Sequence, residues 1–325
     1  MSAHAIKEVD ASLQVGGPAI SPGSDEFLAR FADFVAERSL PIDFVSRHAY
    51  TSGPAQHVPF GVHQTLAPAS KLLEQFATPR RQLAGGPLEG LPVHITEFNS
   101  SYRPDNPVHD TAFHAAYLAP VLAAGGDLVD SFSWTFSDMF EEQGIPTSIF
   151  HGGFGLLTHR QIKKPTYHLY AFMARMGEQV LARGEDHLVT RDGDGRVTVL
   201  AWAPADVTGA TPVDGHTVRL SIPVREAASV FELRSSVSEE KGNAWAAWRE
   251  LGRPSSPRPR ELDVLREAAE PVRSHRGLPV EDGRVDLDLR LDRHEATLVE
   301  LTPVVDRTPP WWDDRRLLGL GEESR

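Results

Sequence analysis

The chain has 325 residues, 40% of them hydrophobic and 24% charged, which is ordinary for a globular protein with one large domain and a smaller one. Its formal net charge of −12 argues against nucleic acid as a partner, because neutralising phosphates requires a basic surface. The absence of cysteine excludes disulfides and thiolate-bound metals.

Short apolar runs alternate with longer stretches of helical periodicity over the first 180 residues. The expected strands are Leu13–Ala19, Ile42–Tyr50, Val93–Asn99 and Val129–Phe136. The expected helices are Asp25–Arg38, Lys71–Leu83 with an interruption near Pro79, Ala112–Ala124 and Pro165–Leu181. Four strand–helix units in series indicate parallel βα architecture, either a (β/α) barrel or a doubly wound sheet.

The pattern changes from about His187 onward. Two apolar runs flank Asp192–Gly195, which is a strong hairpin signal. Further short strands are expected at Val218–Val224, Ser229–Leu233, Val285–Leu291 and Thr297–Leu301, with one helix near Glu261–Glu270. We therefore expect an α/β domain over 1–184, an all-β domain, interpreted as a β-sandwich, over 185–305, and a polar tail over 306–325.

Several sequence motifs are absent, and their absence argues against membrane, dinucleotide-binding and metal-binding functions. No stretch approaches the roughly 20 apolar residues of a membrane span, and Met1–Asp10 has no signal-peptide pattern, so we expect a cytoplasmic protein. No Gly-x-Gly-x-x-Gly follows a predicted strand, and the 14 histidines show neither His-Glu-x-x-His nor His-x-His spacing. We expect neither a cofactor nor a metal.

Glu97 is the most informative residue, because it lies where the apolar run Val93–Phe98 ends. The carboxyl ends of parallel strands are where active sites are assembled. A strand-end glutamate paired with an arginine is the structural alternative. Other polar or aromatic side chains lie at the ends of predicted strands or just past them, on the same rim: His48, Tyr50, Asn99, Tyr102, Trp134, Asp138, Glu141 and Glu142.

These residue types suit a sugar site, which needs carboxylates near the scissile bond, an aromatic face and short polar groups for the hydroxyls. Each has a structural alternative. His48 and Trp134 could belong to the core, and the acidic residues Asp138, Glu141 and Glu142 could form a solvated loop face.

The segment His94–Tyr102, followed by Asn106–Thr111, resembles the nucleophile segment of glycoside hydrolase family 39, which holds β-xylosidases and α-L-iduronidases. Further similar stretches are Gly16–Ala19, Asp43–Tyr50, Trp134–Asp138, Phe150–Gly155 and Gly242–Pro254. The resemblance covers nearly the whole chain, and it is greater to the bacterial β-xylosidases than to the α-L-iduronidases.

The resemblance implies a retaining glycosidase whose nucleophile is Glu97 and whose substrate is a xylo-oligosaccharide or another small glycoside. The implied substrate-binding residues are His48, Tyr50, Asn99, Tyr102, Trp134, Glu141 and Glu142. Within this scheme Tyr102 would donate a hydrogen bond to the Glu97 carboxylate. A homo-oligomer is a further expectation.

One departure from the family pattern is clear. The family's acid/base is the glutamate of an Asn-Glu-Pro motif after the fourth barrel strand, and this sequence contains no such motif. Met1–Asp10 instead resembles the helix that follows it. We therefore expect the C-terminal half of a (β/α)8 TIM barrel, strands five to eight, and a complementing N-terminal half-barrel chain as partner. The alternatives are rescue by Glu141 or Glu142 as acid, a non-catalytic sugar-binding protein, or an α-L-iduronidase-like specificity.

Overall fold

The first part of the chain forms a parallel sheet with helices. The computed structural model describes residues 2–59, 61–139, 144–208, 215–224, 227–309, 311–313 and 318. After a short helix α1 (Ser2–Val9), the sheet contains β1 (Gly16–Ile20), β2 (Phe44–Ala49), β5 (Val93–Phe98) and β6 (Ser131–Phe132). They lie in the order β1-β2-β5-β6 and every neighbouring pair is parallel, as the βα pattern predicted.

Helices follow each of these strands, namely α2 (Asp25–Glu37), α3 (Ala69–Leu83), α4 (Ala112–Gly125) and α5 (Pro165–Met173). α3 continues through Pro79 instead of being interrupted there. A small antiparallel hairpin, β3 (Gln56–Val58) and β4 (Gly61–His63), lies between β2 and α3, and a 3-10 helix (Pro107–Asp110) precedes α4. Neither of these short elements was predicted.

Two of the expected elements are much shorter than predicted. The helix expected over 165–181 ends at Met173, and β7 (Gln179–Arg183) then pairs with the first strand of the second part. Gly177 makes this turn possible, since a Cβ there would clash with the backbone of Arg191. The strand expected over Val129–Phe136 is regular only at Ser131–Phe132, because the carbonyls of Thr135 and Phe136 accept hydrogen bonds from the 156–157 segment instead.

The second part consists of antiparallel sheets. Its strands are β8 (His187–Arg191), β9 (Val197–Trp202), β10 (His216–Pro223), β11 (Ser229–Val237), β12 (Val272–Pro279), β13 (Arg284–Leu291) and β14 (Ala296–Pro303). Six strands form one sheet in the order β12-β11-β14-β9-β8-β7, and β10 pairs with β13 in a second. The hairpin predicted at Asp192–Gly195 is confirmed by the β8–β9 pairing. Helices α6 (Ala244–Glu250) and α7 (Pro259–Ala268) connect β11 to β12.

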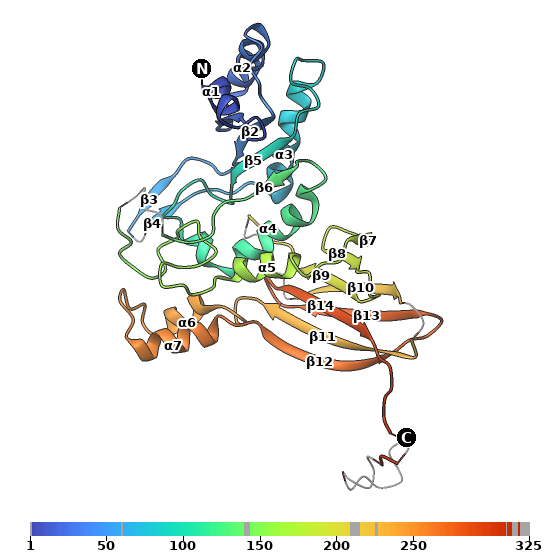
Figure 1. Cartoon of the computed structure of the whole chain (residues 1–325). Helices are drawn as coiled ribbons and strands as arrows, with labels where there is room; N and C mark the ends of the chain where they lie inside the picture. The colour runs from blue at the N-terminus through green and yellow to red at the C-terminus, as the bar shows by residue number, and fades with distance from the viewer. Residues whose placement is uncertain are drawn as a thin grey trace.

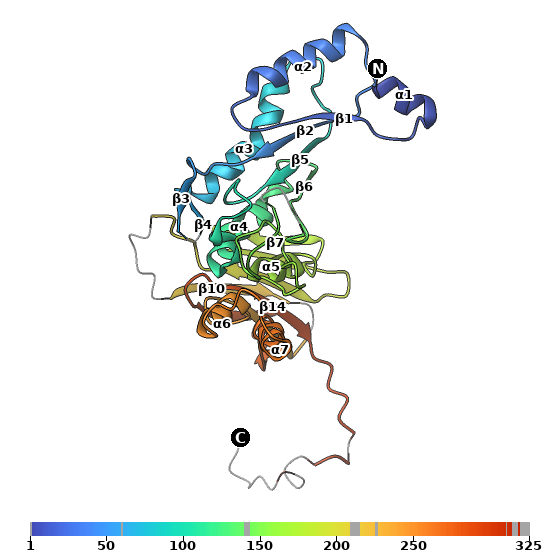
Figure 2. The same ribbon diagram turned by 90° about the vertical axis from the view of Figure 1, so that its left-hand side faces the viewer.

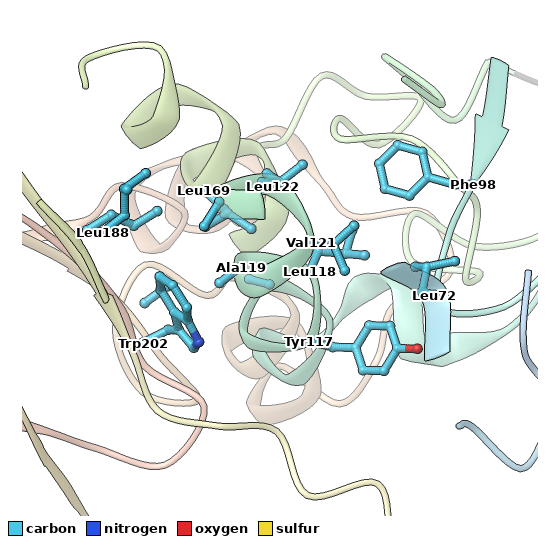
Figure 3. Packing of buried hydrophobic residues seen from close by; sticks show 14 of the residues in the cluster. Leu72, Phe98, Tyr117, Leu118, Ala119, Val121, Leu122, Leu169, Leu188 and Trp202 are labelled. Carbon is cyan, nitrogen blue, oxygen red and sulfur yellow. The ribbon is translucent and has the colours of Figure 1, made fainter. Parts of the chain in front are cut away.

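The six-stranded sheet is covered on both faces. One face packs against β10 and β13 through residues such as Val199, Val299 and Leu289. The other face packs against α4 and α5 through Leu188 and Trp202, which Figure 3 labels, and through Leu200 and Leu298. α4 is apolar on nearly all sides, as expected for a helix that is buried between two sheets. The same hydrophobic core includes residues of β5, α3 and α4, so it connects the parallel sheet to the antiparallel one.

Figures 1 and 2 show the resulting arrangement. α4 and α5 lie between the parallel sheet and the antiparallel sheet, and α1, α2 and β1 lie at the opposite end of the molecule from the antiparallel sheet. β1 forms one outer edge of the parallel sheet. Among the described residues, no helix is both long enough and apolar enough to span a membrane.

Candidate active site

The Glu97 carboxylate lies at the end of β5 and is held by two side chains from the end of β2. The Tyr50 hydroxyl donates a hydrogen bond of 2.5 Å to Oε1, and His48 Nδ1 lies 3.1 Å from Oε2. The Glu97 side chain retains 22% of its exposure to solvent and that of His48 retains 23%. Glu97 is therefore fixed in position and still accessible.

An irregularity in strand pairing brings Glu97 beside His48. Along β2 and β5, Arg47 pairs with Ile95, but the next residue His48 pairs with Glu97, so that Thr96 is passed over. Such a bulge turns the following side chain to the other face of the strand. Without it, His48 would face Thr96. The structural alternative for Glu97, a pair with arginine, is not what is found among the described residues.

The aromatic residues of the predicted site are arranged around this carboxylate. The rings of Tyr50 and Tyr102 meet edge to face, with centroids 6.4 Å apart at 84°. The Tyr102 hydroxyl lies 3.3 Å from the backbone nitrogen of Ala55, and the residue is 41% exposed. The expectation that Tyr102 donates to Glu97 is wrong, because Tyr50 supplies that hydrogen bond.

Trp134 lies just past β6, the strand next to β5 in the sheet. It is half-buried, and its ring meets that of Phe154 edge to face at 6.1 Å. The strand order thus brings Trp134 to the same edge of the sheet as Glu97. The predicted contributors Glu141 and Glu142 lie outside the described residues.

Two predicted rim residues are in the interior instead. Asn99 is 1% exposed, and its Oδ1 lies 2.5 Å from His114 Nε2, so its side chain is in the interior rather than open to a substrate. Asp138 is 1% exposed and pairs with Lys164, so it is no solvated loop face. In both cases the polar side chain is buried because it contacts a buried partner from another part of the sequence, His114 for Asn99 and Lys164 for Asp138.

Lys164 is a buried charged residue beside the predicted site residue Asp138, and the sequence did not reveal it. Its side chain is fully buried, and its Nζ lies 2.7 Å from Asp110 Oδ1 and 2.9 Å from Asp138 Oδ2. Nothing in the local sequence Lys163-Lys164-Pro165 distinguishes it from a surface lysine at a helix start. The only usable signal was His109-Asp110, which lies within the segment that resembles the family.

The electrostatics of this buried cluster are strongly perturbed. Burial would lower the pKa of Lys164, but Asp110 and Asp138 more than offset this and raise it above its usual value. Burial raises the pKa of Asp110 despite the opposing effect of Lys164. Burial also lowers the pKa of neighbouring His109 to about 4, so this imidazole stays neutral near pH 7.

The described side chains offer no group of three or more His, Asp or Glu that could hold a metal ion. The site therefore contains a carboxylate at a strand end, oriented by a phenol and an imidazole, with the exposed ring of Tyr102 against Tyr50 and the half-buried ring of Trp134 at the same edge of the sheet. A carboxylate in this setting can attack an electrophilic carbon of a ligand that rests on the rings.

Comparison with known proteins supports the same interpretation. The model of glycosyl hydrolases family 39 matches residues 1–286. The chain is 45% identical over 314 residues to a β-xylosidase from Geobacillus stearothermophilus, covering 95% of this chain and 61% of that protein. It is 31% identical over 282 residues to a β-xylosidase from Caldicellulosiruptor saccharolyticus, covering 83% of this chain and 55% of the relative.

A solved structure shows that the fold is also shared. The crystal structure of a monomeric β-xylosidase from Caulobacter crescentus CB15 has a TM-score of 0.80 and 27% sequence identity, covering 94% of this chain and 64% of that chain. The chain thus spans about three fifths of the length of the curated relatives it matches. With a family model matched over most of its length, the chain belongs to glycosyl hydrolases family 39 and has the mixed α/β fold of its β-xylosidases.

Proposed function

We propose that this chain provides the nucleophile of a retaining glycoside hydrolase, similar to a xylan 1,4-β-xylosidase, which hydrolyses terminal β-xylosides. The observation that carries the proposal is the geometry of Glu97, a strand-end carboxylate held by Tyr50 and His48 and still open to solvent. The curated relatives are named β-xylosidases, which supports xylose as the sugar.

In the proposed reaction, one Glu97 oxygen attacks the anomeric carbon of a β-xyloside. The bond from that carbon to the leaving oxygen breaks as the ester to Glu97 forms, and water later cleaves the ester with net retention. Tyr50 and His48 keep the carboxylate aimed during the attack. Trp134 would stack against the sugar ring, Tyr102 would line the site, and Glu141 and Glu142 would accept hydrogen bonds from hydroxyls.

The leaving oxygen needs a proton, and the sequence contains no Asn-Glu-Pro motif to supply it. We therefore propose that β1, β2, β5 and β6 are the fifth to eighth strands of a (β/α)8 barrel and that a complementing N-terminal half-barrel provides the acid. Exposed apolar side chains near β1, including Leu13 (47%), Phe27 (49%) and Phe34 (44%), fit a surface that such a partner covers.

The domain organisation proposed with this scheme is a partial barrel over 1–184, a β-sandwich over 185–305 and a tail over 306–325. The pairing of β7 with β8 already attaches 179–183 to the antiparallel sheet. Self-association through the open edge of the parallel sheet is proposed for the chain without its complement. The cytoplasmic location stays a prediction from the sequence.

Chemical rescue provides the functional test. Glu97→Gly should abolish cleavage of 2,4-dinitrophenyl β-xyloside, and added azide should restore it and yield α-xylosyl azide, because azide occupies the space of the missing carboxylate. An activated phenol departs without protonation, so the acid is not needed for this substrate. A non-catalytic sugar-binding protein would bind xylose but show neither cleavage nor the azide product.

A substrate comparison tests the missing acid. Native chain alone should cleave the dinitrophenyl xyloside but lose on the order of 10²–10⁴ in rate on xylobiose, whose leaving group needs protonation. Supplying an N-terminal half-barrel that carries Asn-Glu-Pro should restore xylobiose cleavage. Equal rates of the isolated chain on both substrates would contradict this part of the proposal.

A further inference from the structure

A buried cation, Lys164, joins the loop that follows β5, the strand of Glu97, to the loop that follows β6, the strand before Trp134. Lys164 Nζ contacts Asp110, in the segment after β5, and Asp138, in the segment after β6. It also donates a hydrogen bond of 2.8 Å to the carbonyl oxygen of Gly153. Lys164 is 0% exposed, so it cannot touch a substrate itself.

The same carboxylates also hold the segment 152–155. Gly152 N donates to Asp110 Oδ2 at 2.8 Å, and Gly155 N donates to Asp138 Oδ1 at 2.7 Å. A Cβ on Gly155 would clash with the backbone of Ser137, and one on Gly153 would clash with the Asp138 carboxylate. The glycines thus let this segment lie directly on the cluster around Lys164.

Phe154 lies at the centre of the held segment, between Gly153 and Gly155. Its ring meets the indole of Trp134 at 6.1 Å and the imidazole of His109 at 5.3 Å. His109 in turn lies beside Asp110, and its Nδ1 is 2.8 Å from the Gly152 carbonyl oxygen. The Trp134 ring therefore contacts a segment whose backbone is held by Lys164 and its two carboxylates.

Stability alone does not account for such a cluster. Removing a lysine and two carboxylates from water is expensive, and a well-packed apolar group of similar volume is often as stable in their place. What the charges add is a fixed geometry, because three directed contacts to one ammonium determine where both loops lie.

We propose that Lys164 is a positioning residue that, through Phe154, sets the Trp134 ring as the platform for the sugar. The inference rests on the proposed function, since it gives Trp134 the role of a sugar-binding face. Lys164 acts on binding of the sugar, whereas Glu97, Tyr50 and His48 act on the attack.

The test uses 2,4-dinitrophenyl 2-deoxy-2-fluoro-β-xyloside, which labels the nucleophile of a retaining glycosidase without needing an acid. Labelling is followed by intact mass at several concentrations, which separates the half-saturating concentration from the limiting rate. Lys164→Met should raise the half-saturating concentration roughly tenfold and leave the limiting rate nearly unchanged, because the platform and not the nucleophile is displaced.

A double-mutant cycle distinguishes positioning from general damage. Trp134→Ala should itself weaken binding, and adding Lys164→Met to it should cause less than about a twofold further change, because the platform is already gone. Lys241→Met is the control, since Lys241 also pairs with two carboxylates, Asp292 and Glu295, but in the loops after β11 and between β13 and β14. That variant should leave the half-saturating concentration unchanged.

Two further measurements keep the inference testable. Phe154→Leu leaves the ion cluster intact but removes the ring that contacts Trp134. If Lys164→Met does not fold, Phe154→Leu is used in its place and should raise the half-saturating concentration in the same way. Fluorine NMR of the 5-fluorotryptophan protein, with Trp134 assigned through Trp134→Phe, reports the platform without any catalysis. Its resonance should shift in Lys164→Met and not in Lys241→Met.

The outcomes separate the two proposals. If the native chain is never labelled at Glu97, the proposed function is refuted. The fluorine spectrum would still show whether Lys164 positions the Trp134 ring. An unmoved Trp134 resonance in Lys164→Met, or an equal loss of binding with and without the Trp134 ring, would overturn the positioning role.

Discussion

His168 offers a stability prediction whose size follows from the structure. It lies on α5, is 3% exposed, and its Nε2 is 2.7 Å from the carbonyl oxygen of Ala269 at the end of α7. Burial lowers the pKa of His168 from 6.5 to about 4, although the Ala269 carbonyl and Glu270 oppose the shift. The folded protein thus keeps this imidazole neutral at pH values where the unfolded chain protonates it.

The sign and size follow from proton linkage. The unfolded chain binds more protons between pH 6.5 and about 4, so His168 contributes stability above pH 6.5 that is lost as the pH falls through this window. The loss amounts to about 2 kcal/mol at pH 5 and about 3 kcal/mol in full. His109 and His114 act in the same direction, because burial lowers the pKa of both.

His168→Gln isolates this contribution, because the glutamine amide can still donate to the Ala269 carbonyl but does not titrate. Urea unfolding followed by circular dichroism at pH 7.5 and 5.0 gives the free energy of unfolding of both proteins. The free energy of unfolding of the native protein minus that of His168→Gln should decrease by about 2 kcal/mol from pH 7.5 to pH 5.0, since all other titrating groups are common to both proteins. A difference that stays constant with pH would refute a buried neutral His168.

Other predictions concern single contacts. Tyr50→Phe removes the hydrogen bond to Glu97 and should lower the limiting rate of Glu97 labelling on the order of tenfold to a hundredfold, with the melting temperature little changed. Trp202→Ala should cost about 3–5 kcal/mol in urea unfolding, because Trp202 is 1% exposed in the core that joins the two sheets; a loss below about 1 kcal/mol would contradict that packing. Gly155→Ala should prevent folding or displace Trp134 in the fluorine spectrum, since its methyl group would clash with the Ser137 backbone; an unchanged spectrum and melt would contradict the close approach.

Elements with regular periodicity could be predicted from the sequence. The apolar run before Glu97 predicted β5, and Asp192–Gly195 predicted the β8–β9 turn, because each signal is local. β12 was missed because it is an edge strand that is exposed at nearly every position, so no apolar alternation marks it. The end of α5 at Met173 was missed because the close approach of Gly177 to Arg191 is a tertiary constraint.

The candidate site was predictable only in part. The strand order brings Glu97, His48 and Tyr50 together, as expected from strand ends on one rim. The hydrogen bond to Glu97 was assigned to Tyr102 but comes from Tyr50, because both tyrosines follow strand ends and no local signal distinguishes them. Asn99 and Asp138 turned inward because His114 and Lys164, distant in sequence, supply buried partners.

The central claim is that Glu97 is a nucleophile aimed at an anomeric carbon. The most direct measurement is to incubate the chain with 2,4-dinitrophenyl 2-deoxy-2-fluoro-β-xyloside and to map the modified peptide by mass spectrometry. We expect one fluoroxylosyl group per chain, on Glu97, and none in Glu97→Gln. A label on any other carboxylate, or a Glu97→Gln protein labelled as fast as the native one, would contradict the claim.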